Sequence, residues 1–390
     1  MNYSLSCLGD SRQLFIIWRY ILTEKNNEYM RLALSLAVKG AGYVSPNPMV
    51  GAVIVKNGKI IGQGYHELYG CLHAERNAFK NCIESPVGAD MYVTLEPCCH
   101  YGKNPPCTQA IIDKGIKKVF VGSFDPNPLV AGNGIKQLRD NGIEVVENVL
   151  RDECDRINEV FFHFITTKKP FVMMKYAMTL DGKIACYTGE SKWISSEESR
   201  YNTQEDRHKF KAIMVGVGTV IADNPSLTCR IENSVNPVRI ICDSNLRIPL
   251  NSSIVSTAVD VPTIIATCSN DANKHKILTD KGCKIILTEP KNNRVDLNSL
   301  MNILGKDNID SIILEGGGEL NWSALESGIV HKIKVYISPK IFGGKNAKSP
   351  VGGKGVCYPS DAFCLEKMSL KNIGEDILVE SWVKNVHRYN

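Results

Sequence analysis

Two short stretches of the sequence concentrate side chains that bind metals. They are HAERNAF, residues 73–79, and TLEPCCHYGKNPPC, residues 94–107. Imidazoles and thiolates are usual zinc ligands, whereas a carboxylate beside zinc is more useful as a proton carrier. The two stretches therefore predict a zinc site, but they offer more candidate side chains than one ion needs: His73, Glu75, Glu96, Cys98, Cys99, His100 and Cys107.

Position and spacing narrow this choice. His73 and Glu75 stand at a predicted helix start with one residue between them, so both can face one pocket. Cys107 begins another predicted helix, and a helix N-terminus favours the thiolate that binds metal. Cys98 and Cys99 are adjacent, so only one of them can reach the ion without strain. Zinc nucleobase deaminases carry H-x-E and then P-C-x-x-C; here the second cysteine comes several residues later.

Two alternatives to a catalytic zinc remain at this point. A catalytic zinc keeps three protein ligands and an open position, whereas a structural zinc is closed by four. His100 could be the fourth ligand, in which case the metal would only hold the fold together. The same residues could also bind no metal. We favour the catalytic interpretation, with Glu75 as the group that moves protons.

Composition limits the class of protein. The chain has 390 residues, of which 43% are hydrophobic and 22% charged, enough for two globular domains. A net charge of +5 without a long basic run argues against a nucleic-acid partner. Fourteen cysteines in so long a chain indicate free thiols in a reducing compartment, and hence the cytoplasm. The apolar runs are too short to span a membrane, so no membrane partner is expected.

Hydrophobic periodicity predicts two α/β domains. Residues 1–27 are expected to be an extension, disordered or preceding the true start, rather than a targeting segment. A helix over 28–40, with Met30, Leu34, Ala37 and Val38 on one face, begins a domain that runs to residue 150. Its Asn-Gly pair at 57–58 predicts a β-hairpin. A mostly helical connector follows at 151–169, and a second α/β domain, rich in buried strands, covers 170–390.

Several motifs resemble one known family. SPNPMVGAVIV, HAE, TLEPCCHYGKNPPCTQAII and DPNPLVAGNGI are similar to the bacterial bifunctional riboflavin-biosynthesis deaminase–reductases, whose deaminase motif has this long cysteine spacing. The resemblance continues through MKYAMTLDGKIACYTGESKWISSEESR and SIILEGGGELNWSALE, and so covers nearly all of residues 28–390. It implies a cytidine-deaminase-like three-layer domain followed by a dihydrofolate-reductase-like α/β domain.

The resemblance assigns roles in the first domain. It implies zinc ligands at His73, Cys98 and Cys107, with Glu75 as the proton shuttle. Members commonly carry serine where Cys99 stands, which fits a bystander. Asn47, in the PNP turn, would contact the substrate; otherwise it is an ordinary turn asparagine.

In the second domain the resemblance implies an NADPH site. IILEGGGELNWSALE reads as a strand, three glycines and a helix, and such a turn lets a phosphate approach backbone N–H groups, although a plain tight turn has the same pattern. Ser244, with Arg247 nearby, could bind the adenosine 2′-phosphate. The implied cofactor contacts are Ala177, Trp193, Thr219, Asp223, Ser244, Gly317, Gly318, Glu319, Leu320, Asn321, Trp322 and Ser323.

The same domain would bind the phosphorylated sugar of the substrate. Arg207 and Arg230 are candidates because guanidinium forks match phosphate oxygens, the alternative being a surface salt bridge for each. Lys175 could touch the ribose or be a solvated lysine. The implied substrate contacts of this domain are Lys175, Ser191, Arg207, Leu227, Arg230 and Glu315.

The sequence therefore predicts a chain that performs two consecutive steps of riboflavin synthesis. The first is hydrolytic deamination of 2,5-diamino-6-(5-phosphoribosylamino)pyrimidin-4(3H)-one, and the second is NADPH-dependent reduction of the ribosyl group to ribityl. We also expect a homo-oligomer formed through the reductase domain. The alternatives are a deaminase of tRNA or free nucleosides, and a binding module held together by zinc without catalysis.

Overall fold

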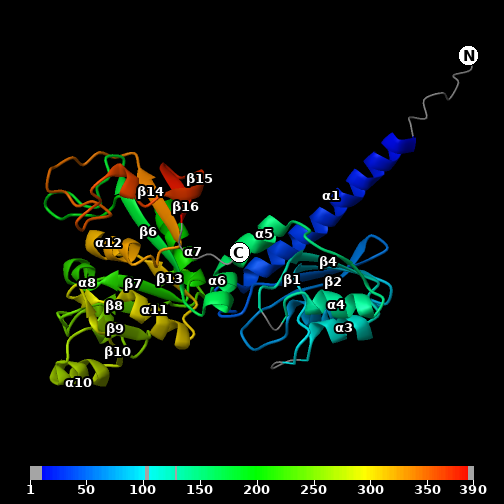
Figure 1. Ribbon diagram of the computed structural model, residues 1–390, viewed down its shortest axis with the longest axis horizontal. Helices are drawn as coiled ribbons and strands as arrows, with labels where there is room; N and C mark the ends of the chain where they lie inside the picture. The colour runs from blue at the N-terminus through cyan, green and yellow to red at the C-terminus, as the bar shows by residue number, and fades with distance from the viewer. Residues whose placement is uncertain (1–10, 102–104, 128–129, 385–390) are drawn as a thin grey trace, which may run out of the picture. The chain divides into compact units, whose positions relative to one another are not determined.

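The computed structural model describes residues 11–101, 105–127 and 130–384, with side chains described from Thr23 onward. The chain forms two compact units that divide after Phe162 (Figure 1). This division falls inside the connector predicted at residues 151–169. No helix in the described part of the chain is both long and apolar enough to cross a membrane.

The first unit is built on a mixed sheet with strand order β2-β1-β3-β4-β5. Strand β1 pairs antiparallel with β2 and β3, whereas β3, β4 and β5 run parallel. The strands are β1 (Gly51–Lys56), β2 (Lys59–Tyr65), β3 (Asp90–Leu95), β4 (Lys118–Ser123) and β5 (Glu144–Val146). Asn57 and Gly58 join β1 to β2 with φ angles of 49° and 74°, which confirms the predicted hairpin and its turn chemistry.

Helices cover both faces of this sheet, so the unit has the three layers expected. Val53 and Val55 pack on the side of helices α1 and α5, and Ile54 packs on the opposite side, as a strand period of two requires. The helices are α1 (Ser11–Ala37), α2 (Ala74–Lys80), α3 (Cys107–Asp113), α4 (Asn133–Asp140) and α5 (Arg151–Ile157). Helix α6 (Glu159–Thr167) follows them.

The first helix differs from the sequence expectation at both ends. Residues 1–10 lie outside the described residues, and α1 already begins at Ser11, so the backbone of residues 11–27 is helical. Val38 does not belong to the buried face: the chain tightens into a 3₁₀ turn over Val38–Gly40, which turns Val38 outward to 46% exposure. Met30 and Ala37 are fully buried, as predicted.

The second unit contains a nine-stranded sheet in the described residues, ordered β10-β9-β8-β7-β13-β6-β14-β16-β15. Its strands run parallel from β10 to β14, and the terminal hairpin β15–β16 adds antiparallel strands that were not predicted. The strands are β6 (Phe171–Thr179), β7 (Ala212–Gly216), β8 (Val238–Cys242), β9 (Thr263–Thr267), β10 (Cys283–Leu287), β13 (Ser311–Leu314), β14 (Lys332–Ser338), β15 (Leu365–Ile373) and β16 (Asp376–Val383).

Helices pack on this sheet around a core of aliphatic side chains. A small separate hairpin, β11 (Pro290–Lys291) and β12 (Arg294–Val295), precedes helix α11. Because the strands are parallel, the loops after β7, β8 and β13 meet at the same edge of the sheet, where ligands bind in open α/β folds. The helices are α7 (Glu197–Lys209), α8 (Val217–Asp223), α9 (Ser253–Ser256), α10 (Ala272–Asp280), α11 (Leu297–Lys306) and α12 (Gly318–Glu326).

Candidate metal centre and cofactor pocket

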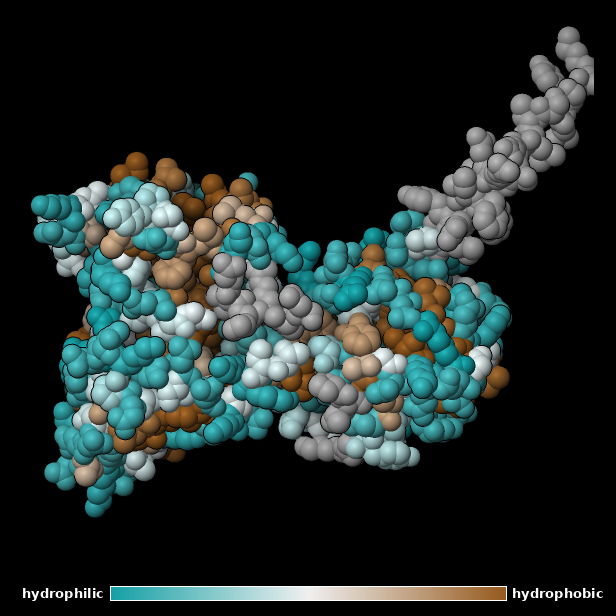
Figure 2. Space-filling model, in the orientation of Figure 1, coloured by the Kyte–Doolittle hydropathy of each residue, from teal (hydrophilic) through white to brown (hydrophobic). Residues whose placement is uncertain are grey.

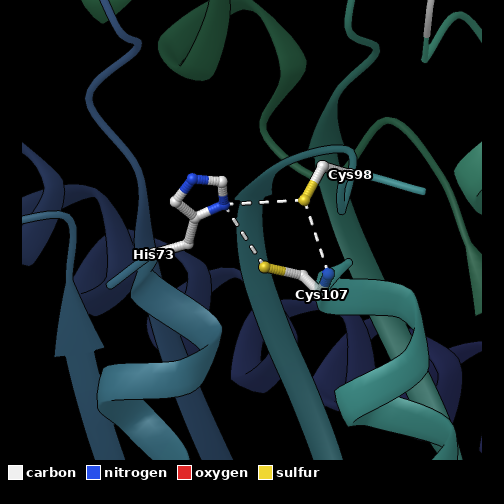
Figure 3. A group of neighbouring side chains, drawn as sticks. All are labelled: His73, Cys98 and Cys107. Atoms are coloured by element: carbon white, nitrogen blue, oxygen red, sulfur yellow. Dashed lines mark hydrogen bonds between the residues drawn. The ribbon is translucent and has the colours of Figure 1, made fainter. Parts of the chain in front are cut away.

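Three predicted zinc ligands converge in the first unit (Figure 3). His73 is the N-cap residue of α2, and Cys107 is the first residue of α3. Cys98 lies in the loop after β3. Two helix starts and one loop therefore supply one side chain each. Their ligand atoms all lie within 4.8 Å of one another.

The distances fit one small cation. His73 Nδ1 lies 3.5 Å from Cys98 Sγ and 3.4 Å from Cys107 Sγ. The Cys107 backbone N–H donates to Cys98 Sγ at 3.4 Å, and Figure 3 shows all three contacts. One imidazole and two thiols form a donor set that suits zinc and leaves a tetrahedral position for a reactant. The residues present therefore fit the metal that the sequence predicts.

The electrostatics of this cluster favour thiolate at Cys98. The hydrogen bond from the Cys107 thiol holds the pKa of Cys98 well below its usual range and raises the pKa of Cys107. The hydrogen bond with Cys98 likewise raises the pKa of His73. Protons are thus shared within the cluster, and a cation bound there would displace them.

Glu75 lies beside the three ligands but is not one of them. Its side chain is buried, only 3% exposed, and it hydrogen-bonds with Cys107. Burial raises the pKa of Glu75, so the carboxyl can hold a proton nearer neutral pH than a solvated glutamate does. A carboxyl of this kind next to a metal is suited to general acid–base work.

The remaining candidates of the two motifs do not join the cluster. Among the described residues, the metal-binding group contains neither Cys99 nor His100, so the fourth ligand of a closed structural site is missing. Glu96 has a different role, because its buried carboxylate accepts the backbone N–H groups of Gly132, Gly134 and Ile135. It thereby holds the start of α4. The sequence motif alone did not reveal this use of Glu96.

Asn47 is held next to the cluster by a histidine that the sequence analysis did not single out as a site residue. His66 donates from Nδ1 to the Leu72 carbonyl at 3.0 Å, so its Nε2 accepts from Asn47 Nδ2 at 3.2 Å. The His66 and His73 rings are 5.4 Å apart. Asn158 also clamps the loop, through both backbone groups of Met49. Asn47 is therefore an oriented side chain and not an ordinary turn asparagine.

In the second unit, a pocket of about 850 Å³ opens along the edge formed by the loops after β7, β8 and β13. Gly317 and Gly218 face open space, so a ligand can approach their backbone. The predicted residues that line it are Ser191, Thr219, Asp223, Ser244, Arg247, Gly317, Gly318, Glu319, Leu320 and Ser323. This pocket is large enough for a dinucleotide, and its glycine turn leads into α12, so it fits the predicted cofactor.

Other predicted cofactor contacts are not among the lining residues. Asn321 is fully buried and donates to the Pro350 carbonyl at 2.8 Å, so it braces the loop after β14. Trp322 packs edge-on against Phe363. Ala177 lies in β6, and Trp193 is exposed under the Arg200 guanidinium. Of the predicted residues in the turn and the start of α12, Asn321 and Trp322 do not line the pocket, whereas Gly317, Gly318, Glu319, Leu320 and Ser323 do.

The predicted substrate contacts form a charged cluster at the centre of the sheet. Arg207 donates from Nε and Nη2 to both Glu315 carboxylate oxygens, at 3.0 and 2.9 Å. Although burial opposes it, the Arg207 charge lowers the pKa of Glu315 to about 2. Lys175 lies over the Tyr336 ring, and burial lowers the pKa of Lys175. Arg207 is thus in a largely buried ion pair, which is neither the free phosphate grip nor the surface salt bridge considered from sequence.

The two remaining contacts lie on the loop after α8. Leu227 is buried with a φ of 52°, and the backbone N–H of Arg230 donates to Gln204. Arg230 itself is exposed and does not line the pocket.

Comparison with known proteins covers both units. Residues 23–123 match the cytidine and deoxycytidylate deaminase zinc-binding region, and residues 170–379 match the RibD C-terminal domain. The riboflavin biosynthesis protein RibD of Actinobacillus pleuropneumoniae is 55% identical over 90% of this chain and 94% of its own length. RibD of Escherichia coli is 35% identical over 90% and 97%.

Solved structures agree with this comparison. The diaminohydroxyphosphoribosylaminopyrimidine deaminase/5-amino-6-(5-phosphoribosylamino)uracil reductase of Thermotoga maritima is 37% identical, with a TM-score of 0.81. It covers 93% of this chain and 99% of its own. RibD of Acinetobacter baumannii gives a TM-score of 0.82 at 32% identity. The fold class predicted from the sequence is confirmed. The chain belongs to the RibD family of riboflavin-biosynthesis proteins.

Proposed function

We propose that the two units carry the two activities of this family separately. The chain is a bifunctional enzyme of riboflavin biosynthesis, a zinc-dependent deaminase and an NADPH-dependent reductase. We assign the deaminase to residues 28–150, the reductase to 170–390 and a connector to 151–169. The substrate of the first step is 2,5-diamino-6-(5-phosphoribosylamino)pyrimidin-4(3H)-one, and the second step reduces the ribosyl group of the deaminated product.

The deaminase chemistry follows from the cluster around His73. Zinc held by His73, Cys98 and Cys107 would lower the pKa of a water molecule and so make it a nucleophile toward the amino-bearing ring carbon near neutral pH. The buried Glu75 carboxylate takes the proton of that water and passes it to the ring nitrogen; it then takes the proton of the newly added hydroxyl group and passes it to the amino group, which leaves as ammonia. Asn47, oriented by His66, presents its amide to the pyrimidine.

The reductase chemistry depends on positioning. NADPH supplies a hydride, and the protein must hold its nicotinamide against the sugar carbon and exclude competing reactions. The glycine turn before α12 receives the pyrophosphate. We assign Lys175, Ser191 and the Arg207–Glu315 pair to the phosphorylated sugar, because they lie at the carboxyl ends of the central strands or beside them.

The observation that carries the deaminase assignment is the convergence of one imidazole and two thiols beside a buried glutamate. A coupled assay that follows ammonia and NADPH separately tests it. Glu75→Gln should keep zinc and lower ammonia release by about a hundredfold to ten thousandfold. NADPH oxidation on the deaminated substrate should be unchanged. Loss of both activities would contradict separate sites, and ammonia release from cytidine or tRNA alone would contradict the substrate.

We also propose a homo-oligomer formed through the reductase unit. Strand β15 is an edge strand, and its Met368 and Leu370 are 60% and 65% exposed. Figure 2 shows apolar atoms over the upper part of this unit, where Figure 1 places β14 to β16. An exposed apolar edge strand favours pairing with another chain.

Sedimentation equilibrium of the full chain checks the oligomer. Leu370→Lys should shift the mass toward the monomer, whereas Ile83→Lys, at an exposed isoleucine of the first unit, should leave it unchanged. A monomeric wild-type chain would contradict the proposal.

We place the enzyme in the cytoplasm, because every cysteine that the structure describes is a free thiol, as expected in a reducing compartment.

A further inference from the structure

The cofactor pocket contains an arginine, Arg294, that was not predicted from sequence. Arg294 stands on the small hairpin β11–β12 and lines the pocket. Its guanidinium donates to Glu319 Oε2 at 2.7 Å and to Ser323 Oγ at 3.1 Å. Arg294 therefore lies across the first turns of α12, the helix whose N-terminus forms the glycine turn.

The hairpin also brings Arg294 next to the end of β8. The backbone N–H of Val295 donates to Ser244 Oγ at 3.1 Å. Arg294 is the residue before Val295 in the sequence and therefore lies close to Ser244. In open parallel sheets, dinucleotides bind outside the carboxyl ends of the strands, with the ribose to one side of the phosphate-binding turn. That turn follows β13, strand β7 lies between β13 and β8, and the loops after all three strands line the pocket. The ribose 2′ position is therefore expected between Ser244 and Arg294.

The carboxylate of Asp243, which could favour a free 2′-hydroxyl, does not face the pocket. Asp243 is fully buried, accepts the Ile248 backbone N–H at 2.8 Å and does not line the pocket. A hydroxyl at the 2′ position would find Ser244 and a guanidinium but not the Asp243 carboxylate. A phosphate group there would meet complementary charge.

A bound ligand can replace Glu319 as the ion-pair partner of Arg294. The Arg294 and Glu319 side chains are 51% and 65% exposed, and ion pairs in water are weak. A phosphate dianion that reaches Arg294 offers a fork of oxygens to the same guanidinium, with higher charge than one carboxylate. Glu319 Oε1 accepts the Gly353 backbone N–H at 3.2 Å, while Oε2 competes with the phosphate for Arg294.

We propose that Arg294 binds the adenosine 2′-phosphate of NADPH and thereby selects NADPH over NADH. This inference rests on the proposed reductase function and adds the residue that sets its cofactor preference. Arg294 acts together with Ser244 at the 2′ position, while the pyrophosphate is held by backbone N–H groups of the glycine turn.

The test measures dissociation constants of NADPH and NADH for the full chain by quenching of protein fluorescence. Arg294→Gln should weaken NADPH binding by about tenfold to a hundredfold, the loss of a charged hydrogen bond, and should change NADH binding by less than about twofold. The NADPH dissociation constant of Arg294→Lys should lie between those of the wild-type chain and Arg294→Gln. Lys284→Gln, at an exposed lysine paired with Asp307 away from the pocket, is the matched control and should leave both cofactors unchanged.

A second variant separates cofactor binding from the structural effect of the ion pair. Glu319→Gln breaks the same pair but leaves the cation, so it should bind NADPH more tightly, by about twofold to fivefold. If Glu319→Gln weakens NADPH as Arg294→Gln does, the pair is structural and the proposal is wrong. Equal weakening of NADPH and NADH by Arg294→Gln, or none, also overturns it. A wild-type chain that binds neither cofactor would instead contradict the reductase function itself.

Discussion

The metal cluster of the first unit and the cofactor pocket of the second are built in opposite ways. The three side chains that we assign to zinc come from residues 73 to 107, two of them at helix starts and one in the loop after β3. The pocket is lined from Ile184 to Gly352, by loops that only the sheet brings together. With only three ligands, each side chain is essential for metal binding. In the long pocket, the free energy of cofactor binding is divided among many groups. Single substitutions should therefore have all-or-none effects in the first site and graded effects in the second.

The largest effect is expected from removing one zinc-binding thiol. Cys107→Ser should lose zinc and, with it, ammonia release, because hydroxyl oxygen is a poor substitute for thiolate at a tetrahedral zinc. NADPH oxidation on the deaminated substrate should continue. Metal content by plasma emission spectroscopy, measured together with ammonia release, checks both statements.

Cys99→Ser is the matched control, since Cys99 is adjacent to Cys98 in sequence but outside the cluster. It should keep zinc and deaminate normally. Loss of metal in this variant would mean that Cys99 is a ligand. The distinction between the three cluster residues and the cysteine beside them would then be wrong.

A smaller effect is expected at the centre of the second unit. Arg207→Met leaves the Glu315 carboxylate buried without its partner and should lower the free energy of unfolding by about 3 kcal/mol. The double variant Arg207→Met, Glu315→Gln should recover much of that loss, because no buried charge remains unpaired. Calorimetric unfolding measures the stability of each variant.

The assay of NADPH oxidation separates stability from function in these variants. Both should oxidise NADPH poorly, since both residues are assigned to the sugar. A double variant that regains full reductase activity would show that the pair only supports the fold. Ammonia release should be unaffected in either case.

The smallest effect is expected in a turn that the sequence alone predicts. Asn57→Ala puts alanine at a φ of 49°, a left-handed conformation that asparagine tolerates better. The free energy of unfolding should fall by about 0.5–1 kcal/mol, with zinc content unchanged. Lys59→Ala, at the exposed start of β2, is the control for a substitution beside the turn. A decrease in the free energy of unfolding as large as that of Arg207→Met would contradict the view that this turn makes only a local contribution to stability.

Local patterns predicted much of the fold and of the metal centre. The Asn57-Gly58 turn, the helices that begin at Ala74 and Cys107, and the strand–glycine–helix unit before α12 all appear where expected. These features depend on neighbouring residues, through turn dihedrals, caps and periodicity, so a short window of sequence contains their cause. The C-terminal hairpin β15–β16 was missed. Strand β15 is exposed along most of its length and lacks a buried, alternating pattern, which explains its omission but not that of β16.

Taken alone, the sequence determined the two α/β domains, the zinc-binding residue types and the glycine turn, because each is encoded by spacing along the chain. Only the tertiary structure decided which side chains meet. It placed Glu96 on the N–H groups at the start of α4, paired Arg207 with Glu315 and brought Arg294 to the pocket wall beside Ser244. Those contacts join residues far apart in sequence, and their partners are chosen by sheet order and packing, which periodicity does not encode.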